Sequence, residues 1–291
     1  MFKTSPFLSE KPWGYEHWII STHSAGEAKV DSSTEFIGNK NLSSIVGKEY
    51  PIMVKIIQAD EILSVQVHPN DEYANKKENS NGKTECWYIL DAEKDASLIY
   101  GIDSIDSIQD GTLENHLIHI PVKKGDFVFI PAGTAHAINK GLRILEVAQS
   151  SDITYRLYDW GRPREIHTEK ALDVITLGTG EHIAGFSGRY ECNHFTLEKL
   201  DFSHTGKICF AKEGIANPIP TAQPPILPAF DTPSSKTGWV SLAILSGTGR
   251  LVSTTGEILE VAAEDCITIR YEEDITVQPT GNEPLSIMKI G

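Results

Sequence analysis

The sequence is poor in the features on which several common protein classes depend. Its 291 residues include only four cysteines, and these are widely separated with no CxxC pair. This spacing argues against a disulfide scaffold and against a thiolate zinc finger, and it fits a reducing compartment. No apolar run approaches membrane-spanning length, and the N-terminus lacks the apolar core of a signal peptide. We therefore expect a cytoplasmic protein with no membrane-spanning segment.

Basic residues are also outnumbered. The chain has 26 Lys and Arg against 40 Asp and Glu, which gives a formal net charge of −14. A surface of this charge repels nucleic acid and anionic membranes, and no basic run offsets it. Neither partner is therefore expected, and an anionic small-molecule substrate would need a few local cations to overcome the background field.

Helical pattern is scarce and is best at residues 41–48, 70–79 and 165–174. Short runs rich in Val, Ile, Tyr and Phe recur instead, bounded by Gly, Pro, Asn and Asp, which is typical of a β-sandwich or barrel. These runs are MVKIIQ (53–58), CWYIL (86–90), DFVFIPA (126–132), LRILEVA (142–148), FTLEKL (195–200), WVSLAIL (239–245), GRLVS (249–253) and DCITIRY (265–271). The pattern predicts a mainly all-β protein with a few short helices.

A glycine-rich stretch near residues 176–192 separates two patterned regions and predicts a domain boundary. We expect an N-terminal domain of residues 1–185 and a C-terminal β-sandwich of residues 186–291. The chain contains no histidine after residue 204, so the second domain is expected to be metal-free. Residues 217–233 hold six prolines and are expected to form a long extended loop.

The segment SVQVHP, residues 64–69, alternates polar side chains with valines. Because a strand sends successive side chains to opposite faces, Ser64, Gln66 and His68 would share one face. Most polar rows of this kind only face water. The row indicates a site only if other ligand-type residues are brought to it.

The stretch GDFVFIPAGTAHAIN, residues 125–139, leads from a strand through a Pro-Gly turn to His136 at the start of the next strand. This stretch resembles the second signature of the cupin superfamily, and it departs from it by one residue at Asn139. In cupins the histidine of this signature is a metal ligand at the mouth of a small jelly roll. Taken alone, the motif leaves a metal role and a structural role about equally open.

The partner signature in cupins supplies His-x-His and then a glutamate. Here Gln66-Val67-His68 stands at the position of His-x-His, and Glu85 follows in GKTECWYIL after a long insertion. Neutral imidazoles, a carboxylate and an amide oxygen suit zinc, although no thiolate is offered. A single exposed His or Glu usually binds nothing. Here several ligand-type residues occur together with the turn motif, and this combination would rarely arise by chance in a protein without a metal site.

Four separated motifs, SVQVHP, GKTECWYIL, PAGTAHAI and SSDITYRLYD (150–159), together resemble the type I mannose-6-phosphate isomerases in their short bacterial form. EKPWGYEHW near the start is similar to the N-terminal signature of this family. The resemblance covers about residues 7 to 175, whereas the C-terminal part is only weakly similar. It implies two cupin-like jelly-roll domains, with the metal site in the N-terminal one.

The resemblance places the functional residues of the family on nine positions of this chain. One zinc ion per chain would be bound by Gln66, His68, Glu85 and His136. The active-site lysine falls on Lys83, and the acid and arginine that follow the last ligand fall on Asp152 and Arg156. The lysine and serine that contact the phosphate fall on Lys55 and Ser64.

The resemblance implies zinc-dependent interconversion of mannose 6-phosphate and fructose 6-phosphate through an enediolate. Zinc and Arg156 would stabilise its negative charge, unless Arg156 is only a structural ion-pair partner of Asp152. Three alternatives stay open. They are an isomerase of another sugar phosphate, a metal oxygenase built on the two-His, one-carboxylate set, and a non-catalytic sugar-phosphate-binding cupin. The sequence determines neither the proton-removing residue nor the oligomeric state.

Overall fold

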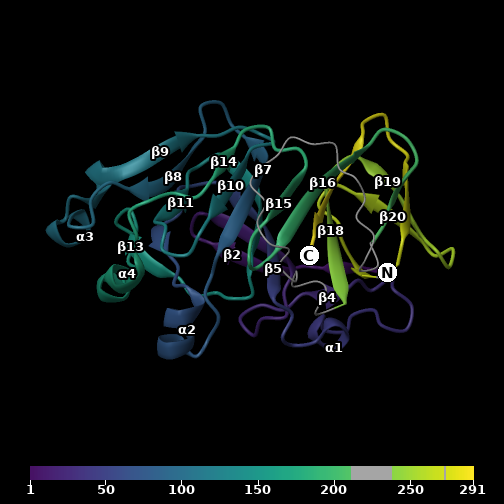
Figure 1. The fold of residues 1–291 in the computed structure, drawn as a ribbon, viewed down its shortest axis with the longest axis horizontal. Coiled ribbons are helices and arrows are strands. Elements are labelled where there is room, and N and C mark those ends of the chain that lie inside the picture. The colour runs from purple at the N-terminus through teal and green to yellow at the C-terminus, as the bar shows by residue number, and fades with distance from the viewer. Residues whose placement is uncertain (211–237, 272) are drawn as a thin grey trace. The chain divides into compact units, whose positions relative to one another are not determined.

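The computed structural model describes residues 1–210, 238–271 and 273–291, so the proline-rich stretch 217–233 lies outside the described residues. The described chain forms two compact units (Figure 1). The N-terminal unit consists of Ser5–Lys29 and Asn39–Phe186, and the C-terminal unit of Met1–Thr4, Val30–Gly38 and Ser187–Gly291. The two units divide after Phe186, and the sequence predicted a boundary after residue 185. Two segments from the start of the chain, Met1–Thr4 and Val30–Gly38, also belong to the C-terminal unit, so the units are not two continuous stretches of sequence.

The N-terminal unit is built from two antiparallel sheets. The seven-stranded sheet has the order β14-β10-β7-β12-β5-β3-β2, and the five-stranded sheet has the order β13-β6-β11-β8-β9. The strands of the first sheet are β2 (Phe7–Lys11), β3 (Gly14–Ile20), β5 (Ile52–Ala59), β7 (Glu85–Ala92), β10 (Phe127–Ile130), β12 (Leu142–Gln149) and β14 (His182–Ile183). Those of the second are β6 (Val65–Val67), β8 (Ser97–Ile102), β9 (Leu117–Pro121), β11 (His136–Ile138) and β13 (Tyr155–Tyr158).

Two apolar clusters hold these sheets in place. The cluster between the sheets includes Trp87, Ile138 and Ile144, each no more than 2% exposed. The other covers the opposite face of the five-stranded sheet, where Val65 and Val67 are fully buried. Because strand residues alternate between faces, the valines of β6 enter this outer cluster while Gln66 points to the space between the sheets.

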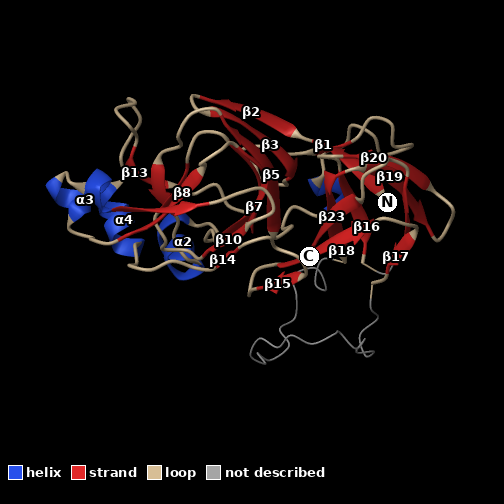
Figure 2. Ribbon diagram, turned by 90° about the horizontal axis from the view of Figure 1, so that it is seen from above, coloured by secondary structure: helices blue, strands red, loops and turns tan. Residues whose placement is uncertain are grey.

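Helices are few and short, and Figure 2 shows α3 and α4 beside β8 and β13. They are α1 (Ser43–Val46), α2 (Asp71–Glu78), α3 (Ser107–Asp110), the 3₁₀ helix η1 (Leu113–His116) and α4 (Thr168–Val174). Three of them, α1, α2 and α4, fall in the stretches predicted from the sequence. The side chain of Asn70 caps α2 by accepting a hydrogen bond from the backbone N–H of Tyr73 at 2.9 Å. No helix in the described residues has the length and apolar character needed to cross a membrane.

The C-terminal unit also contains two sheets, in the orders β15-β16-β23-β18-β21-β1-β4 and β17-β22-β19-β20. The first comprises β1 (Phe2–Ser5), β4 (Lys29–Val30), β15 (Arg189–Glu191), β16 (Thr196–Phe202), β18 (Trp239–Ser246), β21 (Cys266–Arg270) and β23 (Leu285–Ile290). The second comprises β17 (Gly206–Ile208), β19 (Thr248–Ser253), β20 (Ile258–Ala262) and β22 (Ile275–Pro279). The buried core of the C-terminal unit includes Leu242, Ile267, Val277 and Ile287. The prediction of a mainly all-β protein is confirmed.

Candidate active site

A row of polar side chains crosses four strands of the five-stranded sheet. Arg156 on β13 pairs with Gln66 on β6, Gln66 pairs with His136 on β11, and His136 pairs with Tyr100 on β8. Residues directly opposite each other in antiparallel strands project from the same face of the sheet. The register therefore brings Arg156, Gln66 and His136 together, although they are far apart in the sequence.

The seven-stranded sheet presents a second row to the same space. Trp87 on β7 pairs with Glu146 on β12, Glu146 with Lys55 on β5, and Lys55 with Trp18 on β3. Glu85 lies two residues before Trp87 and so projects from the same face. The ring of Trp87 meets that of His136 edge-on, with centroids 5.4 Å apart, which shows that the two rows face each other.

Three of the predicted metal ligands converge between the rows. His68 follows directly after β6, Glu85 begins β7 and His136 begins β11, and all three side chains are at most 1% exposed. One ligand atom from each lies within 4.8 Å of the other two. The Nε2 atom of His136 is 3.3 Å from Oε1 of Glu85, and Nε2 of His68 is 3.7 Å from Oε2.

Both imidazoles are held with Nε2 directed at this group. Nδ1 of His68 lies 2.6 Å from the carbonyl oxygen of Ile153, and Nδ1 of His136 lies 2.9 Å from that of Thr134. Because a carbonyl oxygen only accepts hydrogen bonds, each Nδ1 carries the hydrogen and each Nε2 has a lone pair that can accept a hydrogen bond or bind a metal ion. Burial lowers the pKa of both rings, that of His136 to about 4, so both are neutral at physiological pH.

The carboxylate of Glu85 lacks the hydrogen bonds that its burial demands. Apart from the ion pair of Oε2 with Lys83, neither of its oxygens accepts a hydrogen bond from the described residues. Burial, together with the negative charge of Glu146, raises the pKa of Glu85 to about 7. A buried carboxylate is costly unless cations compensate it. The ammonium of Lys83 is shared between Glu85 and Glu146, so a divalent metal ion beside Glu85 also fits the group.

Gln66 also reaches the group, with its amide Nε2 3.3 Å from Nε2 of His136. Turning the amide over would bring its oxygen to the same place, and an oxygen is what a metal ion would need. Two imidazole nitrogens, a carboxylate and an amide oxygen form a donor set that suits zinc. No thiolate lies in the group of His68, Glu85 and His136.

Buried charges of alternating sign extend from Glu85 along the seven-stranded sheet. Nζ of Lys83 is 2.5 Å from Oε2 of Glu85 and 3.2 Å from Oε1 of Glu146. Nζ of Lys55 is 3.5 Å from Oε1 of Glu146 and 3.5 Å from Oε2 of Glu16. Each cation therefore lies between two carboxylates, which offsets much of the cost of burying it.

Glu146 and Lys83 keep their charges at neutral pH. Burial would raise the pKa of Glu146, but the positive charges of Lys83 and Lys55 outweigh it and hold the pKa at about 2. Burial would lower the pKa of Lys83, but the charges of Glu146 and Glu85 raise it above its ordinary value. Lys83 is therefore suited to donate hydrogen bonds rather than to remove a proton.

The two predicted phosphate contacts are placed differently. Lys55 is 6% exposed, and its ammonium lies 4.4 Å from the ring centroid of Trp18, whose Nε1 donates to Glu16 at 2.7 Å. Ser64 is buried immediately before β6, two residues from Gln66. Lys55 is thus held by an aromatic face and two carboxylates, while Ser64 flanks the strand that carries Gln66.

Asp152 and Arg156 are not brought together. The exposed carboxylate of Asp152 lies 3.6 Å from Nε2 of His23. Arg156 is half-buried, and its Nη1 donates to the carbonyl oxygen of Glu165 at 2.8 Å. No ion pair joins Asp152 and Arg156 in the part of the chain that the structure describes.

Sequence analysis did not identify Glu146 and Glu16, which the structure places beside Lys83 and Lys55. A signal for Glu146 was present, because it is an acidic residue within the apolar run LRILEVA, where both faces of the strand are otherwise largely hydrophobic. A charge in such a run is costly unless it is paired, and this marks it as a candidate for a site. Glu16 alternates with Trp18 in EKPWGYEHW, a much weaker signal.

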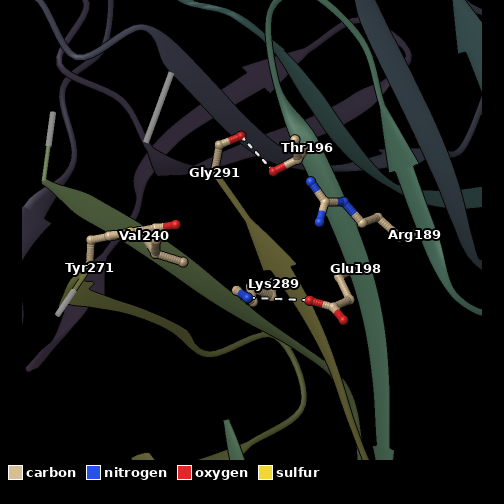
Figure 3. Close-up of a pocket in the computed structure, with 7 residues that line it drawn as sticks. All are labelled: Arg189, Thr196, Glu198, Val240, Tyr271, Lys289 and Gly291. Carbon is tan, nitrogen blue, oxygen red and sulfur yellow. Dashed lines mark hydrogen bonds and ion pairs between the residues drawn. The ribbon is translucent and has the colours of Figure 1, made fainter. Parts of the chain in front are cut away.

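A small pocket of about 80 Å³ in the C-terminal unit also contains charged residues (Figure 3). Its lysine and arginine already have partners. Nζ of Lys289 lies 3.2 Å from Oε2 of Glu198, and Nη2 of Arg189 donates to Oε2 of Glu191 at 2.7 Å. Both cationic side chains of the pocket are therefore already paired with carboxylates among the described residues.

The chain is similar to known proteins of one family. Residues 2–95 match the family model for the type I phosphomannose isomerase catalytic domain. The mannose-6-phosphate isomerase ManA of Bacillus subtilis is 39% identical over 207 residues, which cover 64% of this chain and 64% of ManA. The match thus spans less than two thirds of the length of that relative.

A second B. subtilis relative, YvyI, which is named after the same activity, is 36% identical over 222 residues, covering 62% of this chain and 69% of YvyI. The fold is similar to a crystal structure of the mannose 6-phosphate isomerase from B. subtilis, with a TM-score of 0.79 and 25% identity. That similarity covers 100% of this chain and 99% of the other. On these matches the chain belongs to the type I phosphomannose isomerase family.

Proposed function

We propose that this protein is a zinc-dependent aldose–ketose isomerase that interconverts mannose 6-phosphate and fructose 6-phosphate. The observation that carries the proposal is the convergence of His68, Glu85 and His136 beside the buried pair of Lys83 and Glu146. A metal-ligand group and paired charges in one confined space suit a reaction that moves a proton and develops negative charge on oxygen. Family membership supports the same activity.

The four residues that would hold the metal are Gln66, His68, Glu85 and His136. When bound, a divalent cation supplies Lewis-acid polarisation of the carbonyl and hydroxyl oxygens of the open-chain sugar. The buried carboxylate of Glu85 supports this assignment, because Lys83 compensates it only at Oε2, while Oε1 lies 3.3 Å from Nε2 of His136 and accepts no hydrogen bond from the described residues.

The remaining residues bind the sugar phosphate and stabilise charge. Arg156 lies in the same cross-strand row as Gln66 and His136, so its guanidinium can face the vicinal oxygens on which the enediolate charge develops. Lys83 would donate hydrogen bonds to the same oxygens. Asp152, the acidic residue of the motif SSDITYRLYD, would be a further catalytic residue. Lys55 and Ser64 would hold the phosphate, whose binding energy orients the reacting carbons.

The direct test is turnover of mannose 6-phosphate and of fructose 6-phosphate, before and after removal of the metal with a chelator. We expect interconversion that is lost on chelation, returns with zinc, and proceeds equally with and without oxygen. A requirement for oxygen would support the metal oxygenase instead. Binding of sugar phosphate without turnover would support a non-catalytic binding protein, and turnover of a different sugar phosphate would change the substrate but keep the reaction.

Metal content gives an independent test of the ligand assignment. Elemental analysis of the purified protein should find about one zinc per chain, as expected for a single set of metal ligands. His136→Ala should lose the metal. The matched control is His116→Ala, because His116 is partly exposed and lies against Asp103 rather than in the ligand group. Retention of the metal by His136→Ala would refute the assignment, and a second metal bound by the C-terminal unit would refute its metal-free character. A cytoplasmic location stays a prediction.

A further inference from the structure

The segment from Arg156 to His167 forms a loop that closes on itself. The backbone N–H of Arg156 donates to Nδ1 of His167 at 3.0 Å, and the backbone N–H of His167 donates to the carbonyl oxygen of Arg156 at 2.8 Å. These two hydrogen bonds join the ends of the loop. The position of Arg156 on β13 is therefore coupled to the conformation of the residues that follow it.

The loop is also attached to the segment that leads into β6. Nε1 of Trp160 donates to the carbonyl oxygen of Leu63, and Nη2 of Arg162 donates to that of Ile62, both at 2.7 Å. Trp160 has a φ of 55°, a left-handed conformation that bulky residues rarely adopt and that must be offset by such contacts. The strand that carries Gln66 begins two residues after Leu63.

The carboxylate of Asp159 joins two arginines of the loop. This buried carboxylate accepts two hydrogen bonds from Arg164, from Nε at 2.7 Å and from Nη2 at 2.6 Å, and a third from Nη1 of Arg162 at 3.3 Å. A bidentate contact between a carboxylate and a guanidinium fixes geometry as well as charge. Arg164 precedes Glu165, whose carbonyl oxygen accepts from Nη1 of Arg156 at 2.8 Å. One continuous path of contacts thus leads from Asp159 to the guanidinium of Arg156.

The charges in the loop also couple Asp159 to Arg156. Three guanidinium groups, those of Arg156, Arg162 and Arg164, lie near one buried carboxylate. Burial lowers the pKa of Arg156, the nearby charge of Arg164 lowers it further, and Asp159 opposes both. Without the charge of Asp159, Arg164 would lose its bidentate partner and would repel Arg156 more strongly.

We propose that Asp159 is a positioning residue for Arg156. It holds Arg164, and through Arg164 the carbonyl oxygen of Glu165, so that the guanidinium of Arg156 stays in the row with Gln66 and His136. This inference rests on the proposed function, in which Arg156 stabilises the enediolate. The carboxylate of Asp159 contacts Arg162 and Arg164, and it is not one of the residues proposed to bind the substrate or the metal.

The first test is the kinetics of Asp159→Asn in the zinc-loaded full chain. The substitution keeps the shape but removes the charge and one side of the bidentate contact. We expect kcat to fall about tenfold with little change in KM, because the lost interaction acts mainly in the transition state. Asp126→Asn serves as the control. It weakens the contacts of another buried carboxylate in the same unit, which accepts from the backbone N–H groups of Gly185 and Lys123 and not from the loop, and should leave kcat near the wild-type value at a comparable loss of melting temperature.

A double-mutant cycle separates positioning from a merely structural role. In the Arg156→Ala background, Asp159→Asn should lower the residual kcat by less than about twofold, because its effect operates through Arg156. A loss of kcat that is equally large in both backgrounds would overturn the proposal. So would a loss no greater than that of the Asp126→Asn control.

A measurement that needs no turnover keeps this inference distinct from the proposed function. Modification of Arg156 by phenylglyoxal can be followed by peptide mass spectrometry in zinc-loaded protein. We expect Asp159→Asn to raise the modification rate of Arg156 several-fold, since its guanidinium is then less well held. An unchanged rate would refute the inference even in an active enzyme. A raised rate in a protein inactive on both sugar phosphates would refute the proposed function and leave the inference supported.

Discussion

At the scale of single residues, the N-terminal unit buries more charge than stability alone would favour. Glu85, Lys83, Glu146 and Lys55 are each at most 6% exposed, and they alternate in sign along the inner face of one sheet. Well-packed apolar residues often stabilise a fold as well as or better than such ion pairs. We interpret the alternation as the arrangement that lets Lys83 stay charged beside a metal-ligand group.

Glu146→Gln should destabilise the metal-free protein by about 3 kcal/mol at neutral pH, because it removes one partner from a buried ion-pair network. The pKa of Glu146 in the folded protein, about 2, lies below its ordinary value of 4.5. The stabilisation from its charge is therefore fully present above pH 4.5 and is lost as the pH falls toward about 2. Urea unfolding at about pH 7, 5 and 3.5 should show the gap between wild type and variant narrowing at the lowest pH.

The control for this measurement is Glu61→Gln, since Glu61 pairs with Lys140 at 3.2 Å on the surface, where both side chains are more than half exposed. That variant should differ from wild type by less than about 1 kcal/mol. A gap for Glu146→Gln that stays constant with pH would show that its carboxylate is not ionised in the folded protein.

Arg156→Ala should lower kcat by a factor of about a hundred or more, as the loss of one preorganised charge-stabilising donor typically does. The metal content should not change, because a guanidinium is no metal ligand. Arg156→Lys should recover only part of the activity, since an ammonium lacks the planar fork that can address two neighbouring oxygens.

Lys55→Ala provides the contrast to Arg156→Ala. The loss of a phosphate contact should raise KM for the sugar phosphate, with some loss of kcat if phosphate binding also orients the reacting carbons. If Arg156 has only a structural role, Arg156→Ala would instead lower the melting temperature and keep a nearly normal kcat. Both quantities should be measured on the same preparation.

At the scale of elements, the turn between β10 and β11 connects two of the proposed ligands. Gly133 in this turn donates its backbone N–H to the carbonyl oxygen of His68 at 2.9 Å, and it lies three residues before His136. Its φ is 91°, and a Cβ atom there would lie 3.0 Å from the carbonyl oxygen of Val174. The turn therefore needs glycine both for its conformation and for its close approach to the C-terminal end of α4.

Gly133→Ala should destabilise the protein by about 2 kcal/mol and weaken zinc binding, because the turn that holds His68 and His136 must shift. Gly125→Ala is the matched control. Gly125 has a φ of 92° at the other end of β10, but a Cβ atom there would meet nothing within 4 Å. It should cost about 1 kcal/mol from backbone strain alone and leave zinc affinity unchanged. Equal zinc affinity in the two variants would contradict the role assigned to the turn.

At the scale of the whole molecule, the first strand of the chain is part of the C-terminal unit. β1 pairs with β21, where Phe2 lies opposite Thr268, and Phe2 is buried with its ring 5.9 Å from that of Trp239. The unit therefore needs both ends of the described chain, and contacts between residues this distant in sequence form only after a large loss of chain entropy.

Phe2→Ala should destabilise the C-terminal unit by about 3 to 4 kcal/mol, the usual cost of deleting a buried aromatic side chain. Hydrogen exchange followed by mass spectrometry can assign the effect to a unit. Peptides from β18, β21 and β23 should exchange faster in the variant, whereas peptides from β5, β7 and β12 should exchange as in wild type. Faster exchange confined to the second group would show that β1 supports the N-terminal unit instead.

Local pattern was enough to determine the strand character of most elements and part of the site. The alternation in SVQVHP assigned Gln66 and the two valines to opposite faces, and the Pro-Gly turn placed His136 at the start of a strand. Both features depend on the two-residue period of a strand, which neighbouring residues alone can express. The motifs that resemble the isomerase family added the identities of the proposed ligands.

Only the tertiary structure decided which residues meet. Nothing local in the sequence specifies that Gln66 lies opposite both His136 and Arg156, or that Glu146 lies between Lys83 and Lys55. Strand order and register depend on which faces can be buried together and on closing loops of many residues, so they are properties of the whole chain. The same reason explains why β1 joins the C-terminal unit and why the loop around Asp159 reaches Arg156. Neither arrangement can be predicted from the local sequence.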